Sequence, residues 1–138
     1  MPRIASAASL VLAALAVAGC GGGTLSEKQF QKQVEAIEAL GAEGALVAED
    51  AADGRTTGTF VRVHSRYLEE TGTKVETQLR SAHAVGDLEQ KRVEALRLAR
   101  KVDEELDELS RSSGDPSLAN RLQSRLSDDA DAAKELAK

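Results

Sequence analysis

Apolar residues recur at helical spacing in four long segments, and short breaks rich in glycine, serine or threonine separate these segments. Apolar residues three to four positions apart form one face of a helix, and that face packs on a core. The spacing predicts helices at about residues 26–52, 59–84, 87–110 and 116–136. Helices of similar length joined by short turns favour antiparallel neighbours. We therefore predict an all-α fold, an up-down-up-down four-helix bundle over residues 26–138.

Local signals support the starts of these helices. Ser26 is followed three residues later by Gln29, which is the spacing of a capping box. Asp115 precedes Pro116, an arrangement typical of a capped first turn. Asp87 is predicted to cap the third helix, whose nearly heptad apolar stripe is typical of coiled-coil packing.

The first two predicted helices contain the residues of a possible internal ligand pocket, which are Gly41, Gly44, His64 and Tyr67. Glycine costs about 1 kcal/mol relative to alanine inside a helix, so the two glycines are either weak points or places of close helix approach. A void beside them would form a pocket with the histidine. The alternative for His64 is a partly buried, hydrogen-bonded side chain.

The apolar face predicted for the second helix consists of Phe60, His64, Tyr67, Leu68, Thr71, Val75, Leu79 and Ala82.

Charged residues are unevenly distributed along the third predicted helix. Its first part is basic, and its second part, residues 103–108, is acidic and is interpreted as a solvated face. Folding back of the fourth helix would bring Arg121 and Arg125 beside the acidic part and Asp128, Asp129 and Asp131 beside the basic part. The formal charge of −5 disfavours nucleic acid as a partner, because nucleic-acid binding needs clustered cations.

The amino-terminal segment differs from the rest of the chain. Arg3 precedes an uncharged apolar run at residues 4–18, and no other run of this kind follows. A run of this length with a basic start is typical of a signal peptide, whereas a transmembrane helix needs about 20 apolar residues. We therefore expect that the mature chain does not span a membrane.

The sequence Val17-Ala18-Gly19-Cys20 resembles the lipobox of bacterial lipoproteins. This resemblance implies a signal peptide at residues 1–19, cleavage before Cys20, and fatty acyl chains such as palmitate on that cysteine. Several acyl chains anchor a protein durably. Residues 20–25 would then be a glycine-rich tether, and the protein would lie on the extracytoplasmic face of the cell membrane. Cleavage after Ala18, with secretion and a free Cys20 thiol, stays open as the alternative.

Residues 20–37 also resemble the start of small helical lipoproteins of high-GC Gram-positive bacteria. Those proteins often carry a second cysteine where this chain has Glu38. The resemblance implies a cellular location and no activity.

The remaining sequence lacks the motifs of catalytic and metal sites. His64 and His83 have no glutamate three residues before them, so the di-iron pattern of helical bundles is missing. We predict no enzyme, no cofactor and no metal. The favoured function is a structural or protein-interaction module of the cell envelope, with an envelope protein as partner. The alternative is a carrier of a small apolar or metal-containing ligand within the bundle.

Overall fold

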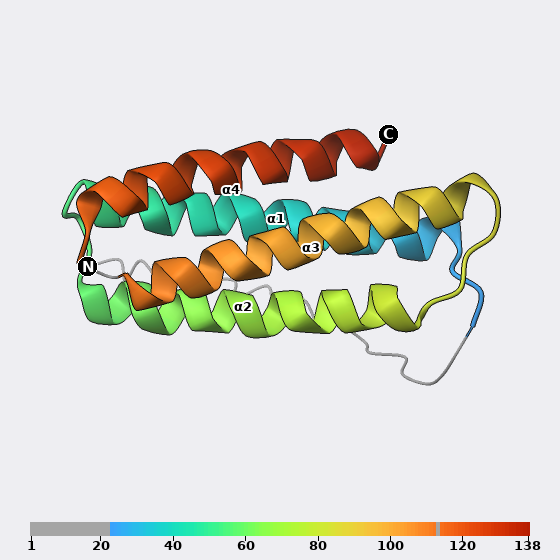
Figure 1. The fold of residues 1–138 in the computed structure, drawn as a ribbon, viewed down its shortest axis with the longest axis horizontal. Coiled ribbons are helices and arrows are strands. Elements are labelled where there is room, and N and C mark those ends of the chain that lie inside the picture. The colour runs from blue at the N-terminus through green and yellow to red at the C-terminus, as the bar shows by residue number, and fades with distance from the viewer. Residues whose placement is uncertain (1–22, 113) are drawn as a thin grey trace, which may run out of the picture.

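The computed structural model describes residues 23–112 and 114–138, which form four α-helices (Figure 1). They are α1 (Glu27–Ala52), α2 (Gly58–Ser81), α3 (Asp87–Arg111) and α4 (Pro116–Leu136). Successive helices run in opposite directions along one common axis. The predicted all-α four-helix bundle is confirmed.

The four helices are packed in a skewed square. The closest neighbours are α1 with α4 and α2 with α3, while α1 also contacts α2 and α3 contacts α4. One diagonal is short, because α1 and α3 touch each other across the centre, whereas α2 and α4 do not touch. The core therefore lies mainly on the contacting faces of α1 and α3.

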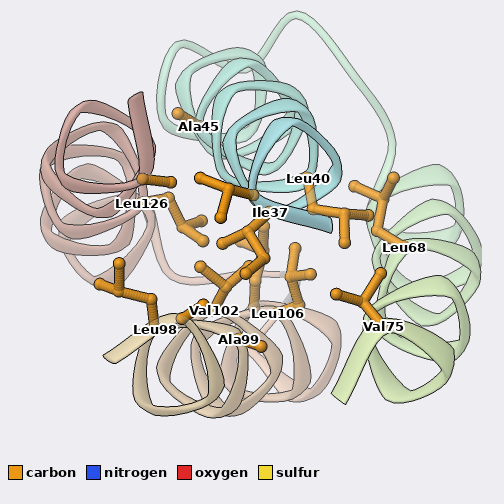
Figure 2. Close-up of a cluster of buried hydrophobic side chains, with 14 of the residues drawn as sticks. Ile37, Leu40, Ala45, Leu68, Val75, Leu98, Ala99, Val102, Leu106 and Leu126 are labelled. Carbon is orange, nitrogen blue, oxygen red and sulfur yellow. The ribbon is translucent and has the colours of Figure 1, made fainter. Parts of the chain in front are cut away.

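Aliphatic side chains from all four helices fill this core, as Figure 2 shows for Ile37, Leu68, Leu106 and Leu126. The apolar face predicted for the first helix is buried throughout its length. Its members are Phe30, Val34, Ile37, Leu40, Gly41, Gly44, Val47 and Ala48.

The predicted apolar face of the second helix was wrong in part. The residues of α2 that are buried repeat with heptad spacing, and they are Val61, Ser65, Leu68, Gly72, Val75 and Leu79. Phe60 and Tyr67 are 48% and 62% exposed. The heptad face is the buried one because α2 packs against both α1 and α3.

The helix ends agree with two of the three predicted caps. Ser26 and Gln29 form the capping box, and the Asp115 side chain accepts hydrogen bonds from the first turn of α4. Asp87 does not cap α3: it is the first helical residue, and Gly86 precedes it with a φ of +61°. This left-handed backbone conformation suits glycine, so the turn itself sets the start of α3.

The loop between α2 and α3 is fixed on both sides. The Arg92 guanidinium donates a hydrogen bond to the carbonyl of Leu79 at 2.7 Å, close to the end of α2. On the other side, the backbone N–H of Leu25 donates to the carbonyl of His83 at 2.7 Å. The second helix therefore ends at Ser81, three residues earlier than predicted, and residues 82–86 connect it to α3.

Candidate functional site

The residues of the predicted lipid attachment, Val17, Ala18, Gly19 and Cys20, lie outside the described residues. The first described residue is Gly23, and the backbone of Thr24 and Leu25 makes the first contacts with the rest of the fold, at His83. Thr24 forms an isolated bridge with His83, and the Leu25 side chain is buried in the core. The chain therefore enters the fold at the α2–α3 loop.

Gly41 and Gly44 are points of close helix packing. A Cβ atom at Gly41 would lie 2.9 Å from the backbone oxygen of Leu126 and 3.1 Å from the Cβ of Ala130, both on α4. A Cβ atom at Gly44 would lie 2.7 Å from Cδ2 of Leu106. The space beside each glycine is thus already filled by α3 or α4.

His64 and Tyr67 lie elsewhere, on α2, where His64 contacts α1 and Tyr67 is exposed. His64 is half-buried, and its Nε2 atom lies 2.7 Å from Oε1 of Glu43 on α1. The predicted pocket of Gly41, Gly44, His64 and Tyr67 therefore does not assemble. The structure instead agrees with the alternative for His64, a partly buried and hydrogen-bonded side chain.

The aromatic rings on α2 form a continuous row. The Phe60 and His64 rings stack with centroids 5.2 Å apart and planes 9° apart, and the Tyr67 ring follows at 6.2 Å from His64. Val63 is exposed next to this row. We call Phe60, Val63, His64 and Tyr67 the aromatic strip. Two of the three Phe and Tyr side chains of the protein belong to it, and only Phe30 is in the core.

A pair of buried carboxyl groups lies between α3 and α4, and the sequence analysis did not predict it. Glu105 and Asp129 are 5% and 3% exposed, and the Nζ atom of Lys101 lies 2.5 Å from one oxygen of Asp129. Among residues 23–112 and 114–138, Glu105 Oε2 and Asp129 Oδ2 find no hydrogen-bond partner. Burial and the neighbouring Asp129 carboxylate raise the pKa of Glu105 from its ordinary value to about 7.

Heptad spacing was the signal that could have located this pair. Glu105 follows Val102 by three residues and precedes Leu109 by four, and Asp129 has the same relation to Leu126 and Ala133. The interpretation of residues 103–108 as a solvated face was thus wrong at Glu105. The predicted approach is found for Asp129, which pairs with Lys101 in the basic part of α3, and for Arg125, which lies 3.7 Å from Glu108 in the acidic part. Within residues 23–112 and 114–138, no ion pair joins Arg121, Asp128 or Asp131 to α3.

A second carboxyl group on α3 faces a glycine of α2. A Cβ atom at Gly72 would overlap Oδ1 of Asp103, so the glycine provides the room for this side chain. Burial, followed by the negative charge of Glu69, raises the pKa of Asp103 to about 7, and a hydrogen bond from Thr73 opposes this rise. The acidic part of α3 therefore contains two groups that hold protons near neutral pH.

Within residues 23–112 and 114–138, no three His, Cys, Asp or Glu side chains come together as a metal site. In the same ranges, no helix has the length and apolar character needed to cross a membrane. Comparison of the chain with family models, with curated proteins and with solved structures gives no match.

Proposed function

We propose that this chain is a lipoprotein of the cell envelope, anchored to the extracytoplasmic face of the membrane through Cys20, and that its bundle binds an envelope protein. The lipobox-like residues support the anchor. The aromatic strip is the observation that carries the binding role. No catalytic step is part of the proposal.

The aromatic strip has the character of a protein-binding surface. Aromatic side chains are enriched in interfaces and supply much of the binding free energy there. Phe60, Val63, His64 and Tyr67 have the spacing i, i+3, i+4 and i+7, which lines them up along one side of α2. The stacking and the bond to Glu43 hold the ring of His64 in place, so little side-chain entropy would be lost at this residue on binding.

A photocrosslinking experiment tests the binding role. A photoreactive residue replaces Val63 in the full-length chain, and membranes from the cells that produce the protein are irradiated. We expect one envelope protein to be captured reproducibly. The double substitution Phe60→Ser/Tyr67→Ser should abolish that capture, because it removes both exposed rings and leaves the core intact.

The matched control is Val93→Ser, which removes an exposed hydrophobic side chain from α3 and should leave the capture unchanged. Circular dichroism should show equal helix content for all variants. Undiminished capture by the double variant, or no capture at all from position 63, would contradict a binding role for the aromatic strip.

A further inference from the structure

The described chain begins at one particular end of the bundle. Leu25 is buried beneath the start of α1, and its backbone N–H donates to His83 in the α2–α3 loop at 2.7 Å. In Figure 1 the blue start of the described chain and the yellow-green α2–α3 loop lie at the same end, on the right. The loops α1–α2 and α3–α4 lie at the opposite end.

The distance from this end to an acyl group on Cys20 is short. Four residue steps separate Cys20 from Thr24, and an extended chain covers at most about 14 Å in four steps. The 24 residues of α2 are about 36 Å long at 1.5 Å per residue. A lipid on Cys20 therefore reaches the α2–α3 end easily, while the opposite end is farther away than the tether can span.

The surface of the α2–α3 end suits a lipid headgroup region. Val85 is 76% exposed, which is the highest value among the exposed large hydrophobic residues. Residues 24–33, 75–93 and 130–138, on the side of the α2–α3 end, contain seven Lys and Arg residues and six Asp and Glu residues, whereas residues 46–64 and 105–122, at the other end, contain four and seven. Anionic lipids attract basic residues near the membrane surface and repel acidic ones, so electrostatics favours the α2–α3 end.

We infer that the bundle stands with its α2–α3 end against the lipid surface and with Val85 in contact with the membrane interface. This inference rests on the proposed anchor at Cys20. His64 lies 17 residues before Ser81, the end of α2, or about 26 Å along the helix. The aromatic strip is then held away from the bilayer, where a protein partner can reach it.

Tryptophan fluorescence tests this orientation, because the chain contains no tryptophan. Val85→Trp places a single indole at the α2–α3 end, and Thr59→Trp places one at the exposed start of α2, at the opposite end. Each variant is purified from membranes as the full mature chain. It is then reconstituted into vesicles of phosphatidylcholine and phosphatidylglycerol whose acyl chains carry bromine, a quencher that acts at short range.

We expect the emission of Val85→Trp to be quenched severalfold more than that of Thr59→Trp. Tryptophan itself favours the interface, but this preference is the same in both variants and cancels in the comparison. Equal quenching of the two variants, or stronger quenching of Thr59→Trp, would overturn the orientation. The mass of each preparation separates the two proposals: diacylated Cys20 with equal quenching defeats only the orientation, and unmodified Cys20 defeats the anchor.

Discussion

Replacing Glu105 with glutamine should stabilise the bundle at pH 8 by about 1–3 kcal/mol, because one unit of pKa shift corresponds to 1.36 kcal/mol. The pKa of Glu105 in the folded chain is about 7, compared with an ordinary value of 4.5. At pH 8 the folded protein must therefore keep an ionised carboxylate buried beside Asp129. Glutamine has a similar size and carries no charge.

The direction of the pH dependence follows from the same values. Between pH 4.5 and 7 the folded state holds a proton on Glu105 and the unfolded state does not. The free energy of unfolding therefore falls as the pH rises through this window and levels off above it. Asp103, with its pKa also raised to about 7, adds a contribution of the same sign.

Urea unfolding followed by circular dichroism at pH 5 and pH 8 measures both effects. We expect the wild-type protein to be more stable at pH 5, and Glu105→Gln to lose a large part of that difference. Glu104→Gln, which changes an exposed neighbour, should behave like the wild type. A wild-type protein that is equally stable at both pH values, together with no gain for Glu105→Gln at pH 8, would show that this carboxyl is not held protonated.

Gly41→Leu should destabilise the bundle by about 3 kcal/mol or more, since overpacking of a well-filled core costs about 1–3 kcal/mol and here the obstacle is backbone. A Cβ atom at this position already lies 2.9 Å from the backbone oxygen of Leu126. Relief of this contact requires α4 to move away from α1. Gly41→Ala should show the same sign with a smaller effect, because the better helix propensity of alanine, about 1 kcal/mol, offsets part of it.

Gly44→Ala is the matched comparison. Its new Cβ atom would meet the ends of the Leu106 and Leu126 side chains, which can rotate aside. We expect its free energy of unfolding to stay within about 1 kcal/mol of the wild type, since the propensity gain and the packing cost are of similar size. Chemical denaturation of the three variants checks this order. A Gly41→Ala variant that is more stable than Gly44→Ala would contradict close packing of α1 against α4.

The sequence predicts the fold well because each helix has a mainly apolar face at helical spacing and clear breaks separate the helices. The prediction failed where two faces of one helix compete. In α2 the aromatic residues and the heptad aliphatic residues lie on neighbouring faces, and hydrophobicity alone favours the larger rings. Which face is buried depends on the positions of α1 and α3, and these are not readable from α2 itself.

For the candidate sites, too, the sequence identified individual residues but not which neighbours from other helices they contact. Tyr67 and His64 were identified from the sequence, but they were assigned to an internal pocket and not to an exposed strip. The sequence left two hypotheses open for Gly41 and Gly44, and the structure shows close packing. The partner of Glu105 comes from another helix, so their pairing needed the register between α3 and α4. Cys20 is proposed as the attachment residue because of the lipobox resemblance.

The mass of the mature chain purified from membranes tests the proposed lipid anchor directly. We expect a chain that begins at Cys20 and carries a diacylglyceryl group on that residue, and we expect Cys20→Ser to show neither this modification nor membrane retention. A chain that begins at Gly19, carries an unmodified Cys20 thiol and is found in the medium would contradict it.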